Sequence, residues 1–207
     1  MTDMNKLPIS IETPRLLIRR WDLDDAAGLK EAIDTSLEHL RPWMPWAHHE
    51  PESLDKKRER IARQRVEFLV GESLHFGVFS SEGARVLGSV SIRITAASGT
   101  ANFGYWLRAD EARRGYATEA VLGCMFVAFR GLDVLTAEIY CDPANVRSAA
   151  IPARLGYHRI PAAVRKTSDG RDRVSEVWQM ARDRFEEIYG MIEDYNLCYE
   201  PSGDTLI

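Results

Sequence analysis

The sequence predicts an α+β domain built on a mixed, mostly antiparallel sheet. Three strand-like segments follow one another with only short turn signals between them, Ser81-Glu82-Gly83 and Ser98-Gly99, and this spacing favours hairpins. A single strand–helix–strand crossover comes after them, which excludes a doubly wound parallel sheet. The 207 residues, 45% apolar and 28% charged, are ordinary for one soluble domain with a substantial core.

The N-terminal part is expected to supply one strand and two helices. Residues 9–21 alternate loosely and are rich in β-branched and bulky side chains, as in a strand. Asp22 is a suitable cap for a helix that runs to about Thr35, and a second helix is expected over 53–70. The run 40–46 between the helices, LRPWMPW, contains too much Pro and Trp to be regular.

The remaining elements follow from alternation and helical spacing. Apolar residues at helical intervals predict a helix over 115–129, and a shorter helix follows over 145–155 in spite of Pro152. A helix that docks or dimerises is expected from Arg182, followed by a loose terminus. The predicted strands are 74–80, 86–95, 101–108, 134–141 and an antiparallel pair, 157–164 with 174–180, around Ser168-Asp169-Gly170.

Charge and cysteine content narrow the range of possible functions. The net charge of −4 gives no reason to expect nucleic-acid binding. Cys124, Cys141 and Cys198 are too widely spaced for a metal-ligand pair or a disulfide framework, so no metal is expected. The start of the chain lacks the pattern of a signal peptide, and no segment approaches the length of a membrane span. We therefore expect a cytoplasmic protein with no membrane partner.

The most informative segment is 113–120, RRGYATEA, which leads from a compact turn into a helix just after the strand-like residues 103–107. The first N–H groups of a helix have no internal acceptors and lie at the positive end of its dipole. Gly115 and small Ala117 let a ligand approach the backbone, so we expect a phosphate or pyrophosphate there. The glycine patterns of nucleotide P-loops and dinucleotide folds are absent from the sequence.

Four stretches of the sequence are informative together: TPRLLIRRW (13–21), FGYWLRADEARRGYATEA (103–120), DPANVRSAAIPARLGY (142–157) and SDGRDRV (168–174). As a set they resemble the GNAT-type, acyl-CoA-dependent N-acetyltransferases of the RimJ/RimL-like, ribosomal-protein-alanine acetyltransferase branch. The resemblance implies a GNAT domain over 8–182, in which a splayed parallel strand pair holds acetyl-CoA, and a C-terminal helical extension and tail over 183–207. Two positions depart from the family's pattern: Ala112 begins the phosphate turn, and Asn102 stands where the branch often has Glu.

The resemblance also assigns residues to the acetyl-CoA site. The backbone around Leu107 and Arg108 would hold the pantetheine arm and polarise the thioester carbonyl, aided by a strand bulge. Asn145 would bind the pantetheine amide, unless it is only a helix cap, and Ser148 would protonate the leaving thiolate, unless it is only a surface serine. Arg154 either reaches the 3′-phosphate or is solvated. The pyrophosphate would lie on the N–H groups of Arg113, Arg114, Gly115, Tyr116, Ala117 and Thr118, with both arginines adding positive charge.

The proton acceptor and the amine site are less defined. Three side chains are candidates for the general base, Glu67, Glu72 and His75, and a water relay is an alternative. The segment 41–49 is the best candidate for a wall of the amine-binding site. The alternative is that its tryptophans only fill the core between the two helices. The substrate-binding candidates are Trp43, Met44, Trp46, Asn102 and Tyr105.

The resulting expectation is transfer of an acetyl group from acetyl-CoA to a primary amine, with the N-terminal α-amine of a protein as the leading acceptor. An α-amine has a pKa near 8, so part of it is already neutral at pH 7. A small-molecule amine, such as an antibiotic or an aminoacyl-type compound, is the alternative acceptor, and a CoA-binding module without transferase activity is the alternative function. The chain would act as a monomer or homodimer.

Overall fold

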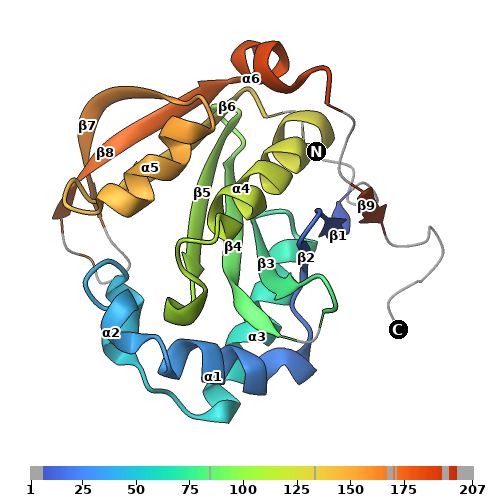
Figure 1. The fold of residues 1–207 in the computed structure, drawn as a ribbon, viewed down its shortest axis with the longest axis vertical. Coiled ribbons are helices and arrows are strands. Elements are labelled where there is room, and N and C mark those ends of the chain that lie inside the picture. Colours follow the sequence, from blue (N-terminus) through green and yellow to red (C-terminus); the bar gives the residue numbers. More distant parts are fainter. Residues whose placement is uncertain are drawn as a thin grey trace.

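The computed structural model describes residues 7–83, 85–132, 134–166, 170, 172–192 and 196–199. They form one nine-stranded sheet in the order β7-β8-β6-β5-β4-β3-β2-β1-β9, flanked by helices (Figure 1). All neighbouring strands are antiparallel except the parallel pair β5–β6. The predicted mixed α+β sheet is therefore confirmed. The strands are β1 (Pro8–Glu12), β2 (Leu16–Arg20), β3 (Ser73–Ser80), β4 (Val86–Thr95), β5 (Thr100–Leu107), β6 (Thr136–Cys141), β7 (His158–Lys166), β8 (Asp172–Ala181) and β9 (Asn196–Tyr199).

Apart from the short helix Leu37–Leu40, which was not predicted, the α-helices lie close to the ranges that the sequence predicts. The Asp22 side chain accepts a main-chain N–H bond at the start of the turn Leu23–Asp25, and the Ser53 side chain does so at the start of the helix Leu54–Leu69. No helix among the described residues has the length and apolarity to cross a bilayer. The α-helices are α1 (Ala26–Asp34), α2 (Leu37–Leu40), α3 (Leu54–Leu69), α4 (Tyr116–Phe126), α5 (Val146–Arg154) and α6 (Arg182–Tyr189), with short helical turns at Leu23–Asp25, Pro45–His49, Ala109–Glu111 and Val127–Gly131.

Two predictions about the chain ends need correction. The single strand expected over 9–21 is a hairpin, because Thr13 turns the chain and its N–H bonds Leu16 O at 2.9 Å. The loose terminus expected after the last helix contains β9, which pairs with β1 at the sheet edge. Other positions from this region lie outside the described residues, namely 193–195 and 200–207, as do Ser168 and Asp169 of the turn expected between the last two long strands.

Two apolar clusters hold the helices on the sheet. The larger surrounds α4, whose Val121, Cys124 and Met125 are fully buried, and it extends to Phe185 of α6. The smaller lies under α1 and includes Trp21. Burial of this apolar surface supplies the main stabilisation of each helix. It also fixes the start of α4 relative to β5.

The sheet opens at its centre because β5 and β6 pair over only part of their length. Thr100–Phe103 pair with Thr136–Ile139, whereas β5 stays paired with β4 as far as Leu107 and β6 stays paired with β8 as far as Cys141. The two strands therefore diverge beyond Phe103. The β4–β5 register is regular throughout, and the register shift in this part of the sheet lies between β3 and β4, beside Phe79. The splay predicted by the resemblance is present, but no shift accompanies it at Leu107.

Candidate active site

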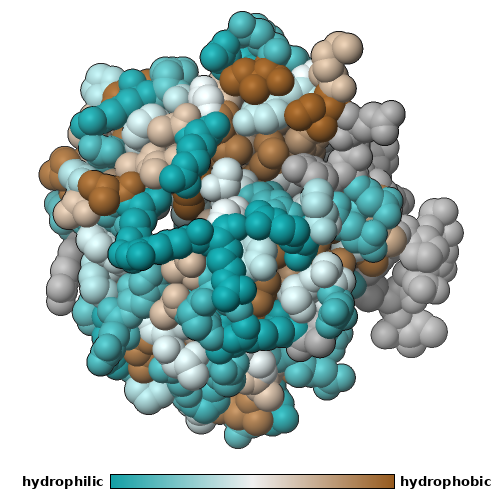
Figure 2. All heavy atoms as spheres, in the orientation of Figure 1, coloured by the Kyte–Doolittle hydropathy of each residue, from teal (hydrophilic) through white to brown (hydrophobic). Residues whose placement is uncertain are grey.

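A cleft of about 690 Å³ opens where β5 and β6 part. Its walls come from α2 and the loop that follows it, from the end of β5, from the turn into α4, and from α5. Figure 2 shows hydrophilic side chains over the middle of this face of the molecule, between α5 and α1 of Figure 1. The cleft brings together twelve of the predicted site residues: Trp43, Met44, Tyr105, Leu107, Arg113, Gly115, Tyr116, Ala117, Thr118, Asn145, Ser148 and Arg154.

The turn into α4 has the backbone geometry of an anion site. Arg113 and Gly115 both have left-handed backbones, with φ of 68° and 83°, and Gly115 is the N-cap residue of α4. The N–H of Glu119 makes the first bond of the helix, to Gly115 O at 3.0 Å. The N–H groups before it have no intrahelical acceptor, so they are available to a negatively charged ligand.

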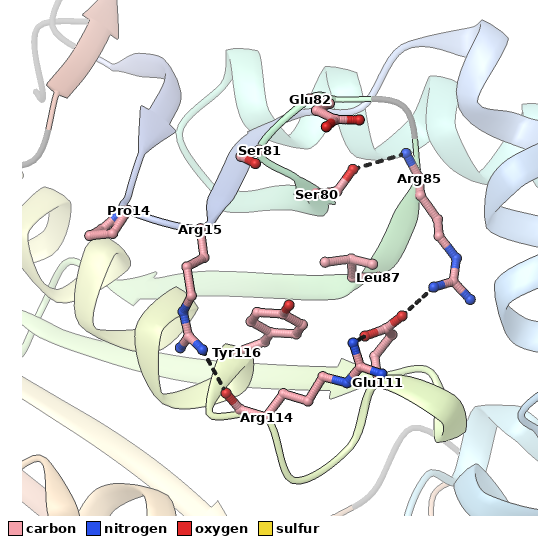
Figure 3. Close-up of a pocket in the computed structure, with 10 residues that line it drawn as sticks. All are labelled: Pro14, Arg15, Ser80, Ser81, Glu82, Arg85, Leu87, Glu111, Arg114 and Tyr116. Atoms are coloured by element: carbon pink, nitrogen blue, oxygen red, sulfur yellow. Dashed lines mark hydrogen bonds and ion pairs between the residues drawn. The ribbon is translucent and has the colours of Figure 1, made fainter.

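A brace from the N-terminal hairpin holds this turn from its outer side (Figure 3). Arg15 donates to Arg114 O at 2.9 Å and to Glu119 Oε2 at 2.7 Å, and Thr13 Oγ1 donates to Glu119 Oε1 at 2.6 Å. The Arg15 guanidinium also lies over the Tyr116 ring, 4.9 Å from its centroid. The stretch 13–21 therefore contributes to the site by positioning the turn.

Three of the four arginines assigned to the acetyl-CoA site point in different directions. Arg113 lines the cleft. Arg114 lines a second hollow of about 460 Å³ on the outer side of the turn and pairs with Glu111 at 3.2 Å (Figure 3). The buried Arg108 lies outside the cleft, where its pKa is raised by hydrogen bonds to Glu31 on α1. Its guanidinium anchors the end of β5.

A polar cluster spans the opening between β5 and α5. Tyr105 Oη lies 3.1 Å from Ser148 Oγ, and Cys141 Sγ lies 3.3 Å from the same hydroxyl. Asn145 caps α5, because its side-chain oxygen accepts from Ser148 N at 3.1 Å. Burial raises the pKa values of Tyr105 and Cys141, so both stay protonated at neutral pH. Ser148 therefore sits in a hydrogen-bonded group whose other members are neutral.

The wall formed by Trp43 and Met44 is fastened across the cleft. Arg173 of β8 donates to the main-chain oxygens of Trp43 and Pro42 at 3.1 and 3.4 Å, and its guanidinium pairs with Asp142 at 2.6 Å. Asp142 follows β6 directly, so one side chain ties the loop after α2 to the end of that strand. The loop is held in place by tertiary contacts in addition to its prolines.

Comparison with known proteins identifies this combination of splayed strands, phosphate turn and cleft. Residues 15–158, more than half of the chain, match the family model described as acetyltransferase (GNAT) domain. The chain belongs to the GNAT acetyltransferase family.

Individual relatives agree with the family match. The "Probable N-acetyltransferase YjcK" of Bacillus subtilis is 30% identical over 109 residues, so the match spans 52% of this chain and 60% of that protein's length. The "putative ribosomal-protein-serine acetyltransferase" of Vibrio cholerae is 28% identical, with a TM-score of 0.73 over 83% of this chain and 97% of the other. Mycobacterium smegmatis RimJ, solved with CoA-disulfide, shares the fold with a TM-score of 0.75 at 21% identity, over 89% and 96% of the two chains.

The three candidate bases lie outside the GNAT cleft. Glu67, Glu72 and His75 come from the junction of α3 and β3, where His75 Nε2 lies 3.0 Å from Glu67 Oε2. Burial lowers the pKa of His75 even though Glu67 opposes the shift. The sequence places these groups near the start of a central strand, but cannot show that β4 separates this strand from the splayed pair.

Two of the substrate-site candidates also lie away from the cleft. Trp46 packs against Trp106, with ring centroids 5.8 Å apart, and under the Arg60 guanidinium. This contact agrees with the alternative interpretation, in which Trp46 fills space in the core. Asn102 sits inside the parallel β5–β6 pair, opposite Glu138, before the strands diverge.

Two residues with charged or titratable side chains line the GNAT cleft but were not predicted from the sequence. His39 comes from α2, and Arg147 comes from the first turn of α5. Burial first, and then the charge of Arg147, lower the pKa of His39, so its imidazole is neutral at pH 7. Arg147 stands beside Ser148 in a stretch already singled out, but nothing in the sequence pairs it with His39. Among the described residues, no three His, Cys, Asp or Glu side chains form a group that could hold a metal ion.

Proposed function

We propose that this protein transfers an acetyl group from acetyl-CoA to a primary amine, with the N-terminal α-amine of a protein as acceptor. The observation that carries the proposal is the cleft between the splayed strands, which has the phosphate turn at one side and the Ser148 cluster at the other. Family membership and the CoA-bound state of Mycobacterium smegmatis RimJ support the choice of donor.

The residues present fit a coenzyme A donor. The free N–H groups at the start of α4 suit a diphosphate, and Arg113 and Arg154 line the same cleft without an ion-pair partner among the described residues. The edge of β5 beyond Phe103 has lost its β6 neighbour, so its backbone groups are open to an amide-containing arm. The bound thioester supplies an activated acetyl group.

Ser148 is the proposed proton donor to the departing sulfur. Its hydroxyl is held by Tyr105 from β5 and lies beside Cys141, in a partly buried position on the cleft wall. A hydroxyl held in place can deliver a proton at the moment when charge develops, and that contribution is typically about 10²–10⁴-fold in rate. His39 is the proposed proton acceptor, because it is the one imidazole among the described lining residues and is neutral at pH 7.

An α-amine acceptor suits this site because it needs only a weak base. Its ordinary pKa near 8 leaves a usable neutral fraction at pH 7, unlike a lysine amine near 10.4. Trp43 and Met44 form an apolar wall over the cleft that can exclude water from the reacting groups.

The test is thiol release from acetyl-CoA with a panel of short peptides, with the products examined for added acetyl groups by mass spectrometry. Peptides with free N-termini should release thiol, and the same peptides with blocked N-termini should not. Acetylation of small amines but of no peptide would show that the acceptor is a small molecule and not a protein N-terminus. Tight acetyl-CoA binding with no thiol release from any amine would support a CoA-binding module instead.

A further inference from the structure

The charges that line the cleft are of one sign. Three arginines line it, Arg113, Arg147 and Arg154, and none of the described lining residues is Asp or Glu. None of the three has a hydrogen bond or ion pair with any residue that the structure describes. Unpaired guanidinium groups gathered in one cleft are suited to anionic ligands.

The second hollow, on the other side of the phosphate turn, provides a contrast. It also has three arginines, but Arg15 pairs with Glu119, Arg85 with Glu111 and Asp110, and Arg114 with Glu111 (Figure 3). Those positive charges are already neutralised within the protein. The second arginine-lined hollow therefore does not share the unpaired charge of the cleft.

The position of Arg147 separates it from the two arginines assigned to the donor. Arg113 belongs to the phosphate turn, and Arg154 is in the last turn of α5. Arg147 is seven residues before Arg154 in the same helix, which corresponds to roughly 10 Å along its axis. It is adjacent in sequence to Ser148, and its charge reaches His39 of α2. Arg147 is therefore the lining arginine that adjoins Ser148 in sequence and whose charge acts on His39, the two groups proposed to transfer protons.

We propose that Arg147 binds an anionic group carried by the acceptor close to its amine, so that the preferred acceptors bear a carboxylate near the reacting nitrogen. This inference rests on the proposed acetyl transfer. A carboxylate accepts two parallel hydrogen bonds from a guanidinium, and the exposed Arg147 has no competing acid on the cleft wall. The carboxylate can come from a peptide side chain that follows the N-terminus or from the α-carboxylate of a small amino acid.

The experiment compares acceptors that differ only in charge. Amidated peptides with Glu at the second position are tested against the same peptides with Gln, and free amino acids against their amides. The Glu peptides should have kcat/KM about ten-fold higher, which corresponds to ~1.4 kcal/mol. Arg147→Ala should abolish this preference and Arg147→Glu should reverse it, while the KM for acetyl-CoA stays close to that of the wild type.

Arg93→Ala is the matched control, because Arg93 is exposed on β4, lies outside the cleft and also has no acid partner among the described residues. It should retain both the preference and the activity. A preference confined to free amino acids would identify the α-carboxylate as the source of the anion. Equal kcat/KM for Glu and Gln peptides and for acids and amides, or an Arg147→Ala variant that loses affinity for acetyl-CoA instead, would overturn the inference while leaving acetyl transfer intact. Absence of thiol release with every amine would overturn both.

Discussion

Tyr105 Oη lies 3.1 Å from Ser148 Oγ and donates to the main-chain oxygen of Ser148 at 3.2 Å. The phenol comes from β5 and the serine from α5, so the contact spans the opening between the splayed strands. It orients the serine hydroxyl at the point where the two walls meet. Because burial raises the pKa of Tyr105, the phenol remains a neutral hydrogen-bonding group across the pH range of normal assays.

Replacing Ser148 by Ala should lower kcat by about 100-fold, as expected for loss of a positioned proton donor. The dissociation constant for acetyl-CoA should change little, because Ser148 is not part of the turn proposed to bind the diphosphate. Tyr105→Phe should give a smaller loss, since the donor remains but is less well held. Steady-state kinetics and equilibrium binding separate these effects, and a parallel fall in turnover and affinity for Ser148→Ala would show that the serine only shapes the cleft.

The left-handed backbone of Gly115 leads to a second prediction. Gly115→Ala should weaken acetyl-CoA binding by about ten-fold or more, because a side chain at φ 83° costs about 1 kcal/mol and reshapes the turn. The new Cβ would also lie 3.3 Å from Arg15 Nη2. Isothermal titration calorimetry with acetyl-CoA measures the loss.

Gly170→Ala is the control for that experiment. Gly170 has a similar φ of 79° and no described atom within 4 Å of an added Cβ, and it does not line the cleft. It should show the same strain in thermal unfolding without the loss of affinity. If both variants bind acetyl-CoA like the wild type, the turn does not hold the diphosphate.

Elements marked by local signals could be predicted from the sequence, and those set by distant partners could not. The strand β4 was predicted over 86–95 as observed, because turn residues bound it on both sides. The strand β9 was missed, since residues 196–199 become a strand only by pairing with β1 at the other end of the chain. Propensity alone carries no information about such a partner.

The same distinction applies to the candidate site. Backbone sites in consecutive residues, such as the turn at 113–118, can be found from glycine spacing and the start of a helix. The directions of long side chains cannot, because the acids that they pair with decide them. Arg108 turns toward Glu31 on α1, which is remote in sequence, and Arg114 turns toward the nearby Glu111 and away from the cleft. His39 was missed for the same reason, because only the tertiary fold brings α2 to the cleft.

The brace between the N-terminal hairpin and α4 should couple stability to donor binding. Arg15→Ala and Glu119→Ala are each expected to weaken acetyl-CoA binding, because either change releases the turn that carries the free N–H groups.

A double-mutant cycle on unfolding free energy should give a coupling of about 1 kcal/mol, since Glu119 is largely buried and accepts several hydrogen bonds. The exposed pair Lys56–Glu59 provides the comparison and should give a much smaller coupling, because water screens both charges. Equal coupling in both pairs would contradict the brace.

Loss of the Arg173 side chain should weaken binding of the amine acceptor and leave binding of acetyl-CoA unchanged. Arg173→Ala removes the hydrogen bonds to the main-chain oxygens of Pro42 and Trp43 and so loosens the wall of the amine site. The KM for the amine should therefore rise several-fold, as expected for the loss of about one hydrogen bond from a charged group. The KM for acetyl-CoA should not change. Arg173→Lys keeps the charge beside Asp142 but lacks the fork that reaches the two oxygens, so it should resemble Ala. Full activity of the Lys variant would mean that the ion pair alone matters.

The pH dependence of stability follows from two histidines. The pKa values of His39 and His75 are both lowered in the folded protein, mainly by burial, from an unfolded value of about 6.5. Below that pH the unfolded chain binds more protons than the folded one, so the free energy of unfolding should fall as the pH drops below about 6.5 and be unaffected by these groups above it.

Nuclear magnetic resonance titration of the imidazole rings assigns each pKa. Arg147→Ala should raise the pKa of His39, because it removes a nearby positive charge, and should leave that of His75 unchanged. An unaltered His39 pKa in this variant would place Arg147 too far from α2 to act on the acceptor end of the cleft.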